Sequence, residues 1–290
     1  MPTKKIHQSS ASPLAFAALV AGNVAIAFGP LLVRYADSGP IATGFWRLAL
    51  AVPFLALMGW RAGFRLSTTS GSIIGWTALA GLFFGIDIIA WHIGIFQTKL
   101  GNATLFANCA SLLLVIYGVF VARKLPGKWQ MLAVILAFVG AALLMSQSLE
   151  LSPKNFAGDL LSLGAGLAYT AYLVIMIRVR DTTESWGALA LASVVAAIVL
   201  LPAAMFAGEQ IIPTVWWPLI LLAFSSQFFG QGCLTYALPH FSPLVIGLAL
   251  LLQPALSAAA GWIAFGEILS ALDIFGGFMV MAARVLVRKQ

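Results

Sequence analysis

The chain has 290 residues, of which 61% are hydrophobic and 9% are charged, and its formal net charge is +7. Soluble globular proteins carry about 25% charged residues, so this composition excludes that class and predicts an integral membrane protein. The positive charges are spread over short segments between apolar runs rather than gathered in one patch. They therefore indicate membrane topology and argue against a nucleic-acid partner.

Ten apolar runs follow one another along the chain, joined by short connections. A bilayer core about 30 Å thick is crossed by about 20 helical residues, and each run is about that long. The runs are continuous, whereas a membrane β-barrel needs shorter segments of alternating hydrophobicity. We therefore predict an all-α integral membrane protein with ten transmembrane helices, at about residues 13–34, 40–59, 73–96, 101–121, 128–147, 156–177, 186–206, 215–237, 242–265 and 270–287.

The distribution of Lys and Arg predicts the orientation of these helices. Segment 1–12 is polar and basic, and the apolar run after it is too long for the core of a secretory signal, so we expect a cytoplasmic tail and a retained first span. Alternation from that tail places twelve Lys and Arg residues on the cytoplasmic side and three on the outer side, with Arg47 inside the second run. This asymmetry follows the positive-inside rule and predicts that both termini are cytoplasmic.

The two halves of the chain resemble each other weakly. A shift of 144 residues aligns 21–37 with 165–181, and both stretches end in the pattern R-x-x-D, at Arg34/Asp37 and Arg178/Asp181. Five spans per half is an odd number, so the halves must enter the membrane in opposite directions. We predict an inverted repeat of residues 13–147 and 156–287, with a site near the membrane midplane between them.

These features resemble the EamA-type drug/metabolite transporters. The resemblance covers residues 13–287 and rests on Arg47 early in the second span and on Pro254, Glu267, Gly276 and Gly277 near the C-terminal end. It implies a secondary transporter, with bacterial inner-membrane exporters of amino acids and related metabolites as the nearest members. The family position of Arg47 suggests a structural or gating role. Ala110 and Arg123 replace the Pro and Glu expected in the first half, which leaves the substrate branch open.

The third span, "GLFFGIDIIAWHIGIF" (81–96), carries Asp87, Trp91 and His92. A charged side chain at a helix centre costs about 2.5–3.5 kcal/mol on insertion scales, so such residues usually face the bundle interior or a wet cavity. Asp87 and Trp91 are four residues apart and share a face. Asp87 is interpreted either as a packing hydrogen-bond partner or as a proton carrier. The Trp91–His92 pair resembles one in aromatic amino-acid exporters, and each residue either lines the substrate cavity or packs between helices.

Other spans carry polar residues at helical spacing, including Thr104, Asn108 and Ser111 in the fourth and Gln253 and Ser257 in the ninth. Each can also serve as an interhelical contact worth about 0.6 kcal/mol. The simplest arrangement points them at one shared pathway. The predicted substrate-binding residues are Asn23, Trp91, His92, Asn108, Tyr169, Tyr172, Gln227, Gln231 and Tyr236, and the predicted coupling or gating residues are Asp87, Arg47, Pro30 and Pro254.

Proline and glycine indicate where helices can bend or approach closely. Pro30 and Pro254 are candidate hinges, because proline removes a backbone hydrogen bond and kinks a helix. Gly81-x-x-x-Gly85, Gly164 and Gly166 offer small surfaces for a neighbouring helix. The alternative is that these residues only allow tight packing.

The predicted cavity is mostly neutral, with amides, hydroxyls, aromatic rings, one acid and no deeply placed Lys. Phosphorylated substrates need several cations and are disfavoured, whereas a small amphipathic solute such as an amino acid fits. No GxxxxGK[ST] stretch exists, which argues against transport driven by ATP within this chain. The alternatives are a multidrug-type efflux carrier, a membrane enzyme using Asp87 and His92, and a subunit without transport activity.

We expect no cofactor and no metal site, and Cys109 and Cys233 are interpreted as packing residues. The expected partners are a small-molecule substrate and the lipid bilayer. Because one chain already contains both halves, a monomer can in principle suffice.

Overall fold

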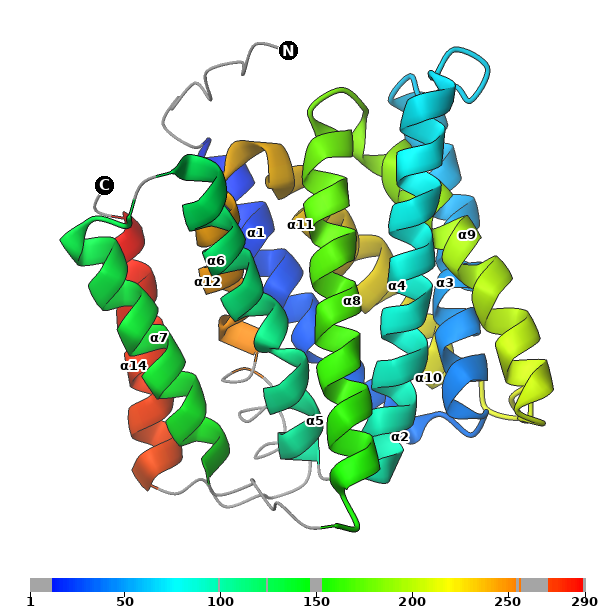
Figure 1. Cartoon of the computed structure of the whole chain (residues 1–290). Coiled ribbons are helices and arrows are strands. Elements are labelled where there is room, and N and C mark those ends of the chain that lie inside the picture. Colours follow the sequence, from blue (N-terminus) through cyan, green and yellow to red (C-terminus); the bar gives the residue numbers. More distant parts are fainter. Residues whose placement is uncertain are drawn as a thin grey trace.

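The computed structural model describes residues 12–98, 100–123, 125–146, 153–253, 256 and 271–288. Within these ranges every regular element is a helix, which confirms the all-α prediction. Pro254 and Glu267 lie outside the described residues. Figure 1 shows the helices as one bundle in which long elements run side by side in opposite directions.

The first half of the chain forms the helices α1 (Pro13–Ala27), α2 (Gly29–Tyr35), α3 (Pro40–Arg61), α4 (Gly71–Gln97), α5 (Leu100–Ala107), α6 (Cys109–Ala122) and α7 (Lys128–Ser146). The second half forms α8 (Phe156–Arg180), α9 (Ser185–Phe206), α10 (Trp217–Leu221), the π-helix η1 (Leu222–Gln231), α11 (Gly232–Ala237), the 3-10 helix η2 (Leu238–His240), α12 (Pro243–Leu250) and α14 (Ala271–Arg288).

Five described segments are long and apolar enough to cross a membrane, namely Pro13–Tyr35, Pro40–Arg61, Gly71–Gln97, Phe156–Arg180 and Ser185–Phe206. Shorter apolar helices lie at Cys109–Ala122 and Lys128–Gly140. The count of ten transmembrane helices stays a prediction. In Figure 1, α1 begins and α14 ends at the same end of the bundle. That the cytoplasm lies at this end also stays a prediction.

Three of the predicted spans are interrupted rather than continuous. α1 ends at Ala27 and α2 begins at Gly29, with Pro30 in its first turn, where its missing N–H removes a helical hydrogen bond. The fourth run divides into α5 and α6 at Asn108, whose Nδ2 donates to the Thr104 carbonyl oxygen at 2.7 Å. The eighth run includes the ten-residue π-helix η1, a rare geometry that is often found at functional sites.

Glycine allows some of the long helices to approach closely. A Cβ added at Gly81 of α4 would lie 2.5 Å from the Ala192 carbonyl oxygen of α9, and one at Gly166 of α8 would lie 2.5 Å from Cys109 Sγ. At Gly85 the nearest atom, of Ala196, would be 3.4 Å away. The predicted close approaches at Gly81 and Gly166 are confirmed, whereas an added Cβ at Gly85 would make only an ordinary contact. The prediction for Gly164 is wrong, because its surroundings are open within 4 Å.

The bundle has a packed interior and an apolar exterior. Leu48, Phe84, Tyr172 and Met176 belong to a buried cluster that joins helices of both halves. Phe206 is 93% exposed and Phe120 is 80% exposed, and they are two of many large apolar side chains on the outside. Such an exterior would be poorly matched to water and suits contact with lipid.

The connection between α9 and α10, residues 207–216, forms hydrogen bonds with the chain around the start of α3. We call this segment and these contacts the α9–α10 clamp. Glu209 accepts hydrogen bonds from the backbone amides of Ile41 (3.2 Å) and Ala42 (2.8 Å) in the first turn of α3. The indole Nε1 of Trp46 donates to the Ile211 carbonyl oxygen at 2.6 Å. The clamp thus joins segments more than 160 residues apart in the chain.

Asp37, between α2 and α3, adds a second carboxylate to the α9–α10 clamp. It accepts hydrogen bonds from the hydroxyl and backbone amide of Thr214 and from the amide of Val215. The hydrogen bond from the Thr214 side chain is the main cause that lowers the pKa of Asp37 below its ordinary value. The charged form of Asp37 therefore favours the clamped arrangement.

Candidate substrate cavity

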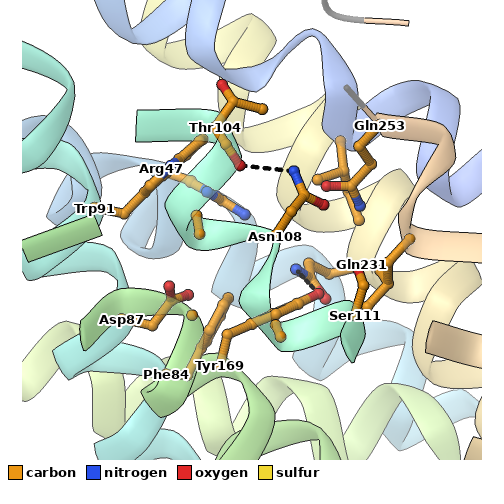
Figure 2. Close-up of a pocket in the computed structure, with 15 residues that line it drawn as sticks. Arg47, Phe84, Asp87, Trp91, Thr104, Asn108, Ser111, Tyr169, Gln231 and Gln253 are labelled. Atoms are coloured by element: carbon orange, nitrogen blue, oxygen red, sulfur yellow. Dashed lines mark hydrogen bonds between the residues drawn. The ribbon is translucent and has the colours of Figure 1, made fainter. Parts of the chain in front are cut away.

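The bundle contains a cavity lined by residues of several helices (Figure 2). Helices from both halves contribute to it. The lining residues are Ile26, Arg47, Phe84, Asp87, Trp91, Thr104, Ala107, Asn108, Ala110, Ser111, Gly166, Tyr169, Gln231, Leu250 and Gln253.

Helix α4 supplies Phe84, Asp87 and Trp91 to the lining, at spacings of three and four residues that place them on one face. The Trp91 indole Nε1 is buried and has no hydrogen-bond partner in the described part of the chain. The Asp87 carboxylate makes no hydrogen bond to a described residue, and Arg47 is the other charged residue in the lining. Two polar groups on α4 are thus available to a solute.

Arg47 of α3 is held in place by a chain of side chains. It is 4% exposed, and its Nε donates to Gln227 Oε1 at 3.2 Å. Gln227 Nε2 in turn donates to Ser193 Oγ at 3.0 Å. The guanidinium lies over the Phe84 ring, 5.9 Å from its centroid, in a cation–π contact. These contacts fix a positive charge in the wall of the cavity.

Amides and hydroxyls line the opposite part of the cavity (Figure 2). Gln231 Nε2 donates to the Tyr169 hydroxyl at 3.2 Å, whereas Gln231 Oε1 is buried without a partner among the described residues. Ser111 Oγ is also buried and unpaired within that part of the chain. An unsatisfied buried polar group costs about 1–3 kcal/mol. These atoms therefore mark positions where a solute or water would bind favourably.

Four of the nine predicted substrate-binding residues line the cavity, namely Trp91, Asn108, Tyr169 and Gln231. Three others lie behind the lining. Asn23 accepts a hydrogen bond from Gln253 Nε2 at 3.0 Å, Tyr172 stacks on Phe84 with ring centroids 4.6 Å apart, and Gln227 holds Arg47.

His92 and Tyr236 lie outside the cavity lining. His92 is fully buried, and its Nδ1 donates to the Pro40 carbonyl oxygen at 2.8 Å, because the next position along α4 is rotated toward α3. The Tyr236 ring instead lies beside His240, with centroids 5.3 Å apart.

The structure places the predicted coupling residues in different surroundings. Asp87 and Arg47 line the cavity. Pro30 is buried near the start of α2, outside the lining, and Pro254 lies beyond the described residues. Arg47 was predicted to have a structural or gating role rather than to line the cavity, although the high cost of a charge in mid-span was a usable signal. Ile26 and Leu250, which also line the cavity, are apolar residues of apolar spans and carry no such signal.

Comparison with known proteins divides the chain into the same two halves. The model of the EamA-like transporter family matches residues 12–146 and again residues 156–288. A solved crystal structure aligns with 98% of this chain and 100% of its own at a TM-score of 0.79, with 14% identity, which shows a shared fold alone.

Curated relatives include exporters from several bacteria. The threonine/homoserine exporters RhtA of Salmonella typhimurium strain LT2 and Escherichia coli strain K12 are both 25% identical, over 83% of this chain and 80% of theirs. The pseudopaline exporter CntI of Pseudomonas aeruginosa strain PAO1 is 22% identical over 84% of both chains. Because the family model covers nearly the whole sequence in two stretches, the chain belongs to the EamA-like transporter family.

Proposed function

We propose that this protein is a secondary transporter that exports small amphipathic metabolites, in the first place neutral amino acids, across a bacterial inner membrane. The observation that carries the proposal is the cavity lined from both halves of the chain. Its aromatic walls suit apolar side chains, and its unpaired polar atoms suit the polar groups of an amino acid. The relatives RhtA and CntI, both exporters, support a metabolite of this kind.

The proposed mechanism is alternating access. Residues 13–147 and 156–287 would form an inverted repeat with both termini in the cytoplasm, and the halves would rock around the cavity so that it opens to each side in turn. The matching of the family model to two stretches supports two such units. In this proposal Trp91, Asn108, Tyr169 and Gln231 bind the solute, and Asp87 couples its movement to that of a proton.

The test is counterflow of labelled L-threonine and L-phenylalanine in proteoliposomes, with wild type, Trp91→Ala and a matched control, Trp76→Ala. Trp76 is on the same helix but is 51% exposed. We expect saturable flux in wild type and in Trp76→Ala, and at least a tenfold weaker apparent affinity in Trp91→Ala, because loss of an aromatic contact and its burial costs about 1–3 kcal/mol.

Absence of amino-acid flux in wild type would refute the proposed substrate class. Flux of a lipophilic cation such as tetraphenylphosphonium would then favour a multidrug-type carrier, and turnover without translocation would favour an enzyme. For coupling, an imposed pH gradient should drive uptake in wild type and not in Asp87→Asn. If the pH gradient drove uptake equally in both proteins, Asp87 would not be the residue that couples transport to protons.

A further inference from the structure

We propose that Arg47 and Asp87 are the two charged poles of a site for zwitterions, with the guanidinium binding the carboxylate of the solute and the Asp87 carboxylate binding its ammonium group. This inference rests on the proposed function and makes it more specific. It gives Arg47 a direct part in substrate recognition in place of the structural or gating role expected from the sequence.

The first support is the way in which Arg47 is held. Gln227 engages its Nε, and the Phe84 ring lies against the guanidinium. Within the described part of the chain, its two terminal nitrogens make no hydrogen bond. A guanidinium anchored at Nε presents two parallel donors, which is the geometry that binds a carboxylate in a bidentate manner.

The second support is the absence of a direct ion pair between Arg47 and Asp87 among the described residues. Both line the same cavity, and no hydrogen bond joins them in the described part of the chain. Opposite charges removed from water are costly unless they are paired and hydrogen-bonded. A zwitterion placed between them would supply the missing partner to each.

The third support is the set of unpaired neutral atoms in the same cavity. Trp91 Nε1 can only donate a hydrogen bond, and Gln231 Oε1 can only accept one. A zwitterion requires both kinds, acceptors for its ammonium and donors for its carboxylate. A simple amine would leave the guanidinium without an anion, and a simple carboxylic acid would leave Asp87 without a cation.

The experiment compares three charge forms, namely an amino acid, the amine that lacks its carboxylate and the acid that lacks its amino group. The first series is L-threonine, 1-amino-2-propanol and 3-hydroxybutyrate, and the second is L-phenylalanine, 2-phenylethylamine and 3-phenylpropanoate. Binding to purified protein is measured by thermal stabilisation, which needs no transport, and competition is measured in counterflow. Wild type should prefer the amino acid over either truncated form by about tenfold or more.

Each variant should change a different part of this selectivity. Asp87→Asn should weaken the binding of the amino acid and of the amine by about tenfold, and should leave the binding of the acid unchanged or tighter. Arg47→Gln should weaken the binding of the amino acid and of the acid, and should not affect the binding of the amine. Arg47→Lys and Asp87→Glu, which keep the charges, should retain the wild-type order and provide readouts if a neutral variant folds poorly. Trp76→Ala serves as the control.

If both neutral variants lost the binding of all three charge forms equally, the two charges would be only structural and the inference would be overturned. Truncated forms that bind to wild type as tightly as the amino acid would also overturn it. These outcomes differ from failure of the proposed function, in which wild type neither binds nor moves any amino acid.

Discussion

At the scale of single residues, neighbouring polar positions of one helix have different tasks. Gln227 and Gln231 lie one turn apart on η1, and both were predicted to contact substrate. Gln231 lines the cavity, whereas Gln227 is fully buried between Arg47 and Ser193. Gln227 is therefore best described as a residue that positions Arg47.

Replacement of Gln227 by Leu should weaken substrate binding without removing a direct contact. The guanidinium would lose its anchor at Nε, and leaving a buried group without its hydrogen bond costs about 1–3 kcal/mol. We expect KM for threonine counterflow to rise about tenfold with a smaller change in maximal rate, and discrimination between the acid and the amine to fall. Trp76→Ala, at an exposed site of α4, is the control. An unchanged KM and unchanged discrimination in a folded Gln227→Leu protein would contradict this role.

At the scale of helices, small residues decide which elements can come into contact. The long helices α4 and α9 approach at Gly81, where a Cβ would lie 2.5 Å from the Ala192 carbonyl oxygen and 2.8 Å from Val195 Cβ. Both of these atoms belong to the packed helix α9, so they cannot move away easily. The face of α4 that carries Phe84 and Asp87 is oriented in part by this contact.

Gly81→Ala should therefore destabilise the protein by about 1–3 kcal/mol, because the added methyl group forces α4 and α9 apart. The same change at Gly164 of α8, where the space within 4 Å is open, should be neutral or stabilising by about 0.5–1 kcal/mol, since alanine favours the helix. Thermal unfolding of both variants in detergent measures the difference. Equal melting temperatures would show that the close approach at Gly81 does not limit packing.

At the scale of the whole molecule, the α9–α10 clamp links the two stretches that match the family model. Glu209 binds the first free amides of α3, as an N-cap residue does, although it lies in the other half of the chain. Asp37 makes the reciprocal contact with Thr214 and Val215. If the halves move relative to each other during transport, these hydrogen bonds are well placed to break and form again.

Glu209→Ala should weaken the clamp by about 0.5–2 kcal/mol, the usual value of a helix cap, and shift the population toward opening at that face. The measurement uses Ser111→Cys in a background with Cys109→Ser and Cys233→Ser, and follows maleimide labelling in the cavity from that side. We expect faster labelling in the Glu209→Ala protein, whereas Trp76→Ala, outside the clamp, should leave the rate unchanged. Equal rates in all three would indicate that the clamp does not control access.

Much of the architecture could be predicted from the sequence, because a bilayer requires long apolar helices and excludes most charges from them. The same rule identified Asp87, and helical spacing placed Trp91 on the same face of α4; both line the cavity. Pro30 was predicted as a hinge, and it lies in the first turn of α2 at the interruption after α1. The interruption at Asn108 and the π-helix η1 were not predicted, since hydropathy reports length and composition rather than the course of backbone hydrogen bonds.

The sequence by itself determined the class of molecule, the resemblance to its transporter family and the small set of polar residues from which a site could be built. Only the tertiary structure decided which of these share one cavity. His92 faces α3, Gln227 holds Arg47, and the Arg47 guanidinium lines the cavity. The physical reason is that spacing along a helix defines its faces, whereas contacts with distant segments set its rotation and neighbours.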